Sequence, residues 1–407
     1  MAVEDPGGRL RFGQLLAVGE FRALWLAQIG SVLGDQLARV ALTLLVYGRT
    51  HSALLAAVTF AASVVPVFVG GLLLSGLADR YPRRRVMIIS DVIRVALVLA
   101  MTVPHVPIAV LVVLLFAVTM AGVPFTSARA ATYPDVLPGE LYVLGTAVTL
   151  TTFQFAQVLG FALGGAVVTL VGVKGALLVD AGTFAISALL TILWVRPRPA
   201  ARSPDAEPSA RGSDLLSSVR LVFREPQLRT PMLLGWLAAF YNAPEAIATP
   251  LSASLGAGAV GVGLILASLA LGASIGAIAF GRLASPAKRV AWMRPLAVAS
   301  CATLTAFALQ PDFPLALVIL FVAGLCDCYQ IVAVTLFVRA TPDSQRSRAF
   351  GLATAGMSLG QGAAMILAGA AAQHYAPATV VAVAGALGAV AAILISARRL
   401  PGPSPER

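Results

Sequence analysis

Long apolar segments recur along the whole chain of 407 residues. A helix needs about 20 consecutive apolar residues to cross a lipid bilayer. Twelve segments of this kind run over residues 23–47, 54–75, 85–103, 106–127, 144–171, 176–195, 231–254, 259–281, 291–309, 314–338, 349–371 and 376–397. They are continuous and do not alternate apolar with polar residues, which excludes a membrane β-barrel. The sequence therefore predicts an all-α membrane protein with about twelve transmembrane helices.

Charged side chains are scarce, and most of them are basic. They make up 12% of the residues and leave a formal net charge of +11, whereas about 25% of residues are charged in soluble domains. The basic residues gather near positions 9–22, 80–85, 196–229, 282–294, 346–348 and 398–399, all on one side of the membrane, and the opposite side has only Arg49 and Lys174. Because cytoplasmic loops carry the excess of Arg and Lys, both termini are predicted to be cytoplasmic. The charge thus reflects topology, and neither a soluble enzyme nor a nucleic-acid-binding protein is expected.

The two halves of the chain repeat each other at an offset of about 204–208 residues. Tyr133-Pro134-Asp135 matches Thr341-Pro342-Asp343, and Gln157 with Gly164-Gly165 matches Gln361 with Ala368-Gly369. We therefore expect one six-helix bundle over residues 1–195 and another over residues 231–407. Residues 196–230 are expected to be a cytoplasmic linker in which 213–224 form a short amphipathic helix. Parallel repeats of this kind are typical of secondary transporters.

A basic motif lies between the second and third spans. It reads Gly76-Leu77-Ala78-Asp79-Arg80-Tyr81-Pro82-Arg83-Arg84-Arg85. This motif resembles the cytoplasmic-loop signature of the major facilitator superfamily, Gly-x-Leu-Ala-Asp-Arg-x-Gly-Arg-Arg, with Pro82 in place of the usual glycine. The resemblance implies the major facilitator fold, with two pseudo-symmetric six-helix bundles.

The same resemblance implies a gating loop that latches the two halves together on the cytoplasmic side. Its residues are Gly76, Asp79, Arg80, Arg83 and Arg84. The equivalent loop of the second half, Gly281-Arg282-Leu283, lacks the aspartate, so the latch is expected to be single-sided. The alternative is a loop that only sets the topology.

A glycine motif in the fifth span bears on the direction of transport. Gly160, Gly164 and Gly165 resemble the superfamily's antiporter signature, Gly-Pro-x-x-Gly-Gly, with Phe161 where proline is usual. The resemblance favours export. The alternative is close helix packing alone, which small residues at this spacing permit in any membrane protein.

Ionisable side chains within spans are costly and point to function. Asp35 and Arg39 lie four residues apart on the first span and can pair; Ser31-Val-Leu-Gly34-Asp35 resembles the first helix of the macrolide-efflux and siderophore-export branch. Glu245 and Asp327 have no basic residue within a turn, and an apolar setting favours the protonated carboxyl that a proton carrier requires. Asp35, Glu245 and Asp327 are therefore proton-coupling candidates. The alternatives are a structural ion pair and carboxyls satisfied by neighbouring hydroxyls or amides.

Polar and aromatic side chains on the first, fifth, seventh and tenth spans predict a substrate cavity. An apolar lining with a few polar groups suits amphiphilic organic molecules. The candidates are Trp25, Gln28, Phe153, Gln154, Gln157, Tyr241, Asn242, Tyr329 and Gln330. Elsewhere, Asp91 and Arg94 are expected to pair with each other or with the loop arginines, and Asp180 is expected to be structural.

These features predict proton-coupled efflux of a drug-, macrolide- or siderophore-like compound by alternating access. The transporter is expected to be a monomer in a bacterial inner membrane, since 27 arginines against 2 lysines indicate a GC-rich bacterial genome. A symporter or facilitator for uptake stays open, as does a transport-inactive membrane sensor or assembly subunit. No enzyme activity, cofactor or metal is expected: a nucleotide-binding Gly-x-x-x-x-Gly-Lys-Ser/Thr loop does not occur, and Cys326-x-Cys328 is poorly spaced for one metal.

Overall fold

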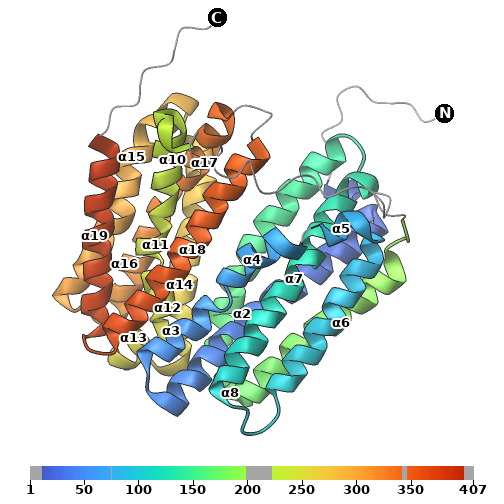
Figure 1. Ribbon diagram of the computed structural model, residues 1–407, viewed down its shortest axis with the longest axis horizontal. Coiled ribbons are helices and arrows are strands. Elements are labelled where there is room, and N and C mark those ends of the chain that lie inside the picture. Colours follow the sequence, from blue (N-terminus) through green and yellow to red (C-terminus); the bar gives the residue numbers. More distant parts are fainter. Residues whose placement is uncertain (1–11, 75, 199–221, 342–345, 398–407) are drawn as a thin grey trace, which may run out of the picture.

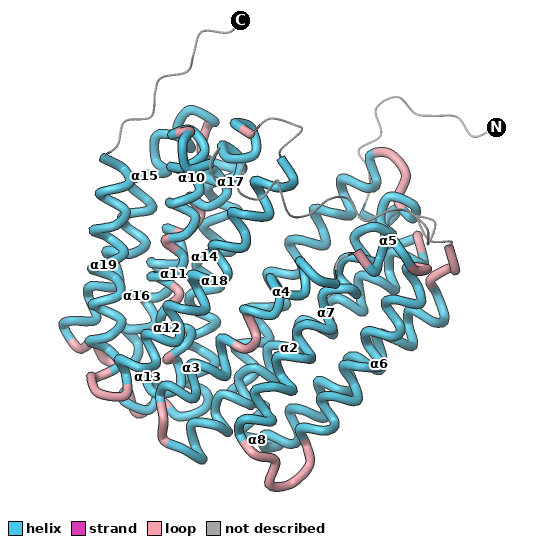
Figure 2. Tube along the Cα trace, in the orientation of Figure 1, coloured by secondary structure: helices cyan, strands magenta, loops and turns pink. Residues whose placement is uncertain are grey.

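The computed structural model describes residues 12–74, 76–198, 222–341 and 346–397. Within these ranges the chain forms helices joined by short turns, and no strand occurs (Figure 2). The first half contains α1 (Phe12–Ala17), α2 (Gly19–Thr50), α3 (Ala53–Ala61), α4 (Val65–Leu74), α5 (Leu77–Arg80), α6 (Arg83–Met101), α7 (Ile108–Val136) and α8 (Glu140–Trp194). The second half contains α10 (Pro226–Trp236), α11 (Ala238–Tyr241), α12 (Ala243–Ala246), α13 (Ala248–Ser254), α14 (Gly258–Leu283), α15 (Pro286–Ala302), the 3₁₀ helix η1 (Thr303–Leu309), α16 (Phe313–Cys326), α17 (Tyr329–Ala340), α18 (Arg346–Ala372) and α19 (Pro377–Ala397).

Helix α8 contains two membrane spans joined by a sharp turn. At 1.5 Å per residue its 55 residues would measure roughly 80 Å if straight, far beyond a bilayer core of about 30 Å. Gly172 has φ 72° and ψ 174°, a conformation open to glycine because it lacks a Cβ, and the helix is interrupted there. Both arms of α8 contact the early part of α2. Trp25 Nε1 of α2 donates to Thr152 Oγ1 of the first arm at 3.1 Å, and the Arg22 guanidinium of α2 lies 5.6 Å from the ring centroid of Trp194 in the second arm. The chain therefore doubles back at Gly172.

The described helices account for the twelve predicted spans. Nine helical segments of the described chain are long and apolar enough to cross a membrane, with α3 and α4, α15 and η1, and α16 and α17 each counted as one segment. One of the nine, α8, supplies two crossings. The remaining crossings are α6, which opens on three arginines and packs between α7 and α8, and the interrupted helix α10–α13. The structure confirms the predicted all-α fold of a multi-pass membrane protein.

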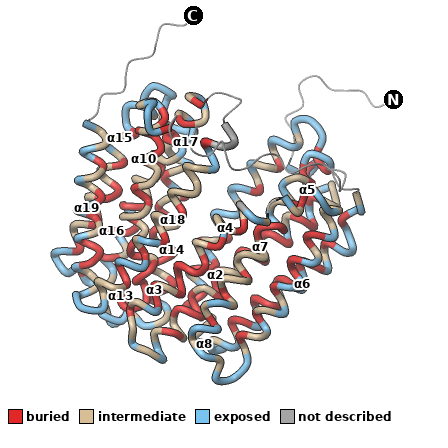
Figure 3. Tube along the Cα trace, viewed as in Figure 1, coloured by how far each residue is buried: buried red, intermediate tan, exposed pale blue. Residues whose placement is uncertain are grey.

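The helices form two bundles that lie side by side (Figure 1). The described chain starts and ends at the same end of the molecule, which we call the terminal end; the opposite end is the far end (Figure 1). Buried positions run through each bundle and through the region where α3, α13 and α14 meet (Figure 3). Residues 199–221, which connect the two halves in sequence, are outside the described residues.

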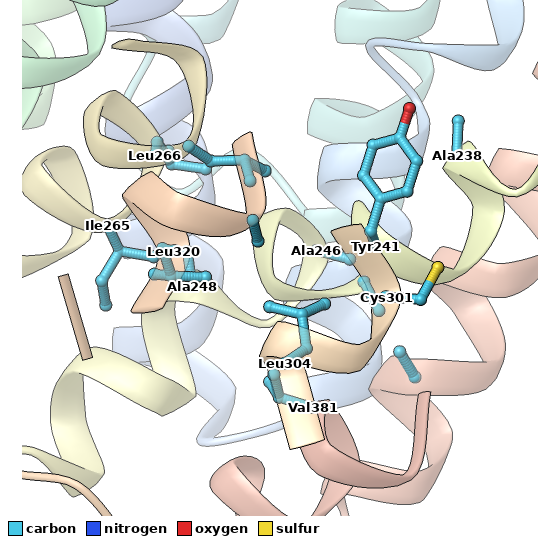
Figure 4. Packing of buried hydrophobic residues seen from close by; sticks show 14 of the residues in the cluster. Ala238, Tyr241, Ala246, Ala248, Ile265, Leu266, Cys301, Leu304, Leu320 and Val381 are labelled. Atoms are coloured by element: carbon cyan, nitrogen blue, oxygen red, sulfur yellow. The ribbon is translucent and has the colours of Figure 1, made fainter. Parts of the chain in front are cut away.

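The apolar core is shared between the bundles at the far end and separate at the terminal end. One buried cluster joins Ala57, Phe60 and Phe161 of the first half to many residues of the second, including Leu266 and Cys301 (Figure 4). Near the terminal end, the cluster around Phe21 and Met87 belongs to the first half, and the one around Leu228 and Phe337 belongs to the second. The halves are thus held together at the far end.

Backbone contacts at the far end are very close. A Cβ on Gly165 of α8 would lie 2.1 Å from the carbonyl oxygen of Ala259 in α14, and one on Gly263 would lie 2.5 Å from that of Phe161. Real Cβ atoms essentially never come within 3.0 Å of another atom. The Ser52 hydroxyl also donates across the interface to Gln373 Oε1 at 3.2 Å. Glycine at these positions lets the halves meet.

Two expectations fall mostly outside the described residues. Of the expected linker with its amphipathic helix at 213–224, residues 199–221 are outside; Val222–Arg224 are helical, and Val222 is buried beside Leu228 and Phe337. Of the repeat motif Thr341-Pro342-Asp343, only Thr341 is described.

Candidate transport site

The seventh span is interrupted three times. Short turns at Leu237, Asn242 and Ile247 separate α10, α11, α12 and α13. Pro244 contributes to the interruption because proline has no N–H to donate and its ring clashes with the carbonyl four residues earlier. Irregular backbone at membrane depth is tolerated where protein buries it or where it lines a cavity.

The tenth span is interrupted opposite the seventh. Helix α16 ends at Cys326 and α17 begins at Tyr329, which places Asp327 at the interruption. The Tyr241 hydroxyl donates to Asp327 Oδ1, and Gln330 Nε2 donates to the Tyr241 hydroxyl at 2.8 Å. Side chains from the tenth span also satisfy backbone carbonyls of α10: Gln330 donates to Gly235 at 3.0 Å and Tyr329 to Leu234 at 3.0 Å. The two interrupted helices are therefore joined by one polar network.

Tyr241 lies at the border between this network and the apolar core. Its ring belongs to the shared cluster, and its hydroxyl points away from Leu304 and Val381 (Figure 4). The structure thus brings Tyr241, Asp327, Tyr329 and Gln330 together, although they come from spans far apart in sequence. Asn242 lies at one of the turns, where its carbonyl accepts from the Glu245 amide at 3.1 Å.

Glu245 in α12 is half-buried and has no hydrogen bond or ion pair with a described side chain. It interacts electrostatically with Arg39 and Asp327. Arg39 belongs to α2 of the other half, and its guanidinium lies 5.5 Å from the Phe60 ring centroid and 5.9 Å from that of Phe161. Glu245 has no basic residue near it in the sequence, but in the structure Arg39 of the first span is the cation that interacts with it.

Asp35 does not form the ion pair expected from its spacing to Arg39. Arg94 of α6 donates from Nη2 to both Asp35 carboxylate oxygens at 2.9 Å. The Arg39 guanidinium instead stacks on two aromatic rings, which provide an attraction of their own. The expected pair between Asp91 and Arg94 is present at 3.5 Å, and Ser187 donates to Asp91 at 2.6 Å.

Among the described residues, the hydrogen bonds and ion pairs of the gating-loop side chains lie within the first half. Arg83 donates to the Ala131 carbonyl and pairs with Asp135, both at 2.7 Å, and Arg84 donates to the Ile192 carbonyl at 2.6 Å. Asp79, in α5, and Arg80 are exposed, and neither forms an ion pair with a described side chain. Gly76 immediately precedes α5. In this state of the protein no hydrogen bond or ion pair between the loop and a described residue reaches the second half.

The glycine motif packs in two directions. A Cβ on Gly160 would lie 2.8 Å from Gln36 and one on Gly164 would lie 3.0 Å from Val40, both in α2, whereas Gly165 faces α14 of the other half. The motif thus joins α8 to a neighbour in its own bundle and to the opposite bundle.

The other cavity candidates are scattered. Gln28 is buried, Gln157 is half-buried, and Phe153 and Gln154 are exposed. None of these three glutamines hydrogen bonds to a charged side chain among the described residues. Trp25 is tied to Thr152. From the sequence, Arg94 and Asp180 are expected to be structural only, although a charge inside an apolar span is the signal that points to a functional role.

Comparisons with known proteins agree with this architecture. A family profile described as Major Facilitator Superfamily matches residues 24–248 and 238–407. The chain is 28% identical over 346 residues to the enterobactin exporter EntS of Citrobacter koseri, with 82% of this chain and 81% of the relative covered. It is 28% identical over 342 residues to EntS of Shigella boydii serotype 4, with the same coverage.

Solved structures share the fold at low identity. A POT family transporter in complex with 5-aminolevulinic acid superposes with a TM-score of 0.73 at 10% identity, covering 93% of this chain and 95% of the other. A bacterial homologue of the human lysosomal transporter Spinster, in an inward-facing and unoccupied conformation, gives 0.69 at 15% identity, with 95% and 96% covered. The nucleoside transporter NupG gives 0.67 at 16% identity, with 92% and 98% covered.

Proposed function

This chain belongs to the major facilitator superfamily, and from that membership we propose that it exports an amphiphilic, siderophore-like compound in exchange for protons. It works as a monomer in a bacterial inner membrane, with both termini in the cytoplasm. The curated relatives are named as exporters of enterobactin, which gives the substrate class. The glycine motif with Gly160, Gly164 and Gly165 favours the same direction.

The observation that carries this proposal is the meeting of two interrupted helices at charged residues. In secondary transporters, discontinuous helices near the bilayer midplane form the substrate and ion sites between the repeats. Here the interruptions in the seventh and tenth spans are joined through Tyr241 and Asp327, with Glu245 beside them. Carboxyl groups inside a membrane are costly and are kept where they move ions or protons. Glu245 and Asp327 are therefore the leading proton carriers.

The arrangement of the halves suits loading from the cytoplasm. The shared apolar core holds the far end together, while the terminal-end clusters belong to single halves. Because the basic loops lie at the terminal end, that end faces the cytoplasm. Substrate enters at the terminal end. The terminal end then closes and the far end opens, which releases the substrate outside.

The gating loop acts in the state in which the terminal end is closed. Asp79 has no ion-pair partner among the described residues in this state, in which the terminal-end clusters belong to single halves. When that end closes, Asp79 meets the second half and forms the single-sided latch, and Arg83 and Arg84 keep the loop fixed to α7 and α8.

The test uses everted membrane vesicles, whose outer surface is the cytoplasmic face, with enterobactin as the probe. Acidifying the lumen is expected to drive enterobactin inward, and a protonophore is expected to abolish this accumulation. Glu245→Gln and Asp327→Asn are expected to lose gradient-driven uptake but keep exchange of labelled for unlabelled probe. Glu140→Gln, at an exposed position outside the site, is the matched control and behaves as the parent.

Other outcomes decide against the proposal. Accumulation that a protonophore leaves unchanged excludes proton coupling. Uptake into right-side-out vesicles driven by external acid supports the symporter alternative. An absence of any transport, with a panel of amphiphilic compounds besides enterobactin, supports a sensor or assembly role.

A further inference from the structure

A second cluster of charged residues lies inside the first bundle, away from the interrupted helices. It contains Asp35 from α2, Asp91 and Arg94 from α6, and Asp180 from the second arm of α8. Asp91 and Asp180 are 0% and 1% exposed, and Arg94 is 4% exposed. The guanidinium of Arg94 is already shared between Asp35 and Asp91. Arg94 is therefore the guanidinium that bonds to carboxyl groups of this cluster, which has three of them.

Asp180 is the carboxyl that lacks a partner. Neither of its two carboxyl oxygens has a hydrogen-bond partner among the described residues. The neighbouring Thr183 hydroxyl donates to the backbone carbonyl of Asp180 at 2.7 Å rather than to its side chain. Burial strongly disfavours an ionised carboxylate that has no partner, and binding a proton removes that penalty.

The backbone of α2 approaches Asp180 unusually closely. A Cβ on Gly34 would lie 2.5 Å from Asp180 Oδ1 and 2.4 Å from Thr183 Oγ1. Glycine at position 34 therefore lets this carboxyl lie against α2, directly beside Asp35. With any other residue the side chains of Asp180 and Thr183 would have to shift, because their oxygens lie where the Cβ would be.

A small cavity connects these carboxyl groups. Its volume is about 20 Å³, and Asp35, Arg39, Ser63, Thr119 and Asp180 are among its lining residues. That is room for about one water molecule. Two guanidinium groups, Arg39 in the lining and Arg94 on Asp35, repel a metal cation from this space. A proton is the cation that the site accommodates.

We propose that Asp180 is a proton-binding site that exchanges its proton with Asp35 through this cavity. The Asp180 carboxyl gives its proton to a water molecule, and that water passes a proton to an Asp35 oxygen. The hydrogen bonds from Arg94 to Asp35 then break, and ionised Asp180 attracts Arg94, whose Nε has no hydrogen-bond partner among the described residues. The charged groups facing this exchange are Asp35, Arg39, Asp91, Arg94 and, from α7, Arg129.

The role of this exchange in transport rests on the proposed function, but the bound proton does not. Infrared difference spectra of the purified, substrate-free protein, recorded between neutral and alkaline pH, report protonated carboxyl groups directly. The parent is expected to show a buried carboxyl band that Asp180→Asn loses and Asp135→Asn, a change at a half-exposed carboxylate, retains. A band unchanged by Asp180→Asn overturns the proposal.

A second variant keeps the test decisive if Asp180→Asn does not fold. Gly34→Ala presses a methyl group toward Asp180 Oδ1, so it is expected to shift the frequency of the same band; an unshifted band also overturns the proposal. The experiments distinguish a failure of the proposed function from a failure of the Asp180 proton site. A parent that shows the band but no proton-driven uptake refutes the proposed function alone, whereas proton-driven uptake without an Asp180 band refutes this inference alone.

Discussion

Replacing Gly165 by alanine is expected to open the far end of the molecule. The added Cβ would lie 2.1 Å from the Ala259 carbonyl oxygen and 2.8 Å from the Val260 Cα, both backbone atoms of α14 that cannot rotate away. The halves must separate there by about 1 Å to reach the 3.0 Å that real contacts keep. Overpacking of this size costs about 1–3 kcal/mol. Because the contact exists only while the far end is closed, this cost shifts the two-state equilibrium about 5- to 150-fold.

The shift can be measured by distances between spin labels in a variant whose native cysteines are replaced. Labels at Lys174 and Tyr375, exposed positions near the far end of the two halves, report that end. Labels at Glu140 and Leu283, exposed positions near the terminal end, report the other. Gly165→Ala is expected to lengthen the first distance and shorten the second in most molecules.

The matched control is Gly182→Ala in the same α8. A Cβ on Gly182 meets nothing within 4 Å, so this variant gains only the higher helix propensity of alanine, about 1 kcal/mol. It is expected to keep both parental distances. If Gly165→Ala also keeps them, the close contact with α14 does not hold the far end shut and the reasoning is refuted.

Three further changes test the charged network. In a thermal unfolding assay in detergent, Arg94→Gln is expected to lower the stability by about 3–5 kcal/mol, because Asp35 and Asp91 lose their buried partner. The comparison is Arg83→Gln, which removes a half-exposed ion pair and is expected to cost at most about 1 kcal/mol. Tyr241→Phe is expected to cost about 1–3 kcal/mol, because the Asp327 carboxyl and the half-buried Gln330 amide lose a hydrogen-bonding hydroxyl. An unchanged unfolding midpoint would contradict this. Arg39→Gln is expected to let protons leak into proteoliposomes without substrate, as measured with a pH-sensitive dye.

The fold could be predicted from the sequence because membrane spans are encoded locally. Each span needs its own run of apolar residues, and the basic loops between them are readable in order. The interruptions were harder to foresee. Pro244 marks one in the seventh span, but the tenth span is interrupted at Asp327 and Cys328, where no proline or glycine stands. The side chains of Tyr329 and Gln330, next to that interruption, donate to backbone carbonyls of the seventh span, so only the packed structure shows these contacts.

The ion pairs show why the site could be predicted only in part. A spacing of four residues places Asp35 and Arg39 on one helix face, and within one helix they are the obvious partners. Arg94 comes closer because α6 packs on α7 and α8 beside α2, a relation between spans that apolar helices with little sequence pattern do not reveal. The same limit hid the cation beside Glu245. Which charges exist was readable from the sequence, and which of them meet was not.

The place of Arg39 between the halves suggests how an exchanger avoids empty cycles. It interacts with Asp35 in its own half and with Glu245 in the other, so ionised Glu245 draws the halves together while the far end is closed. Under the proposed mechanism, an empty and deprotonated transporter is held in that state by this attraction. A proton on Glu245 removes it by neutralising the carboxylate, and a substrate removes it by screening or displacing the carboxylate. Either ligand alone then permits the conformational change, and the empty protein does not make it, which is the condition for coupled exchange.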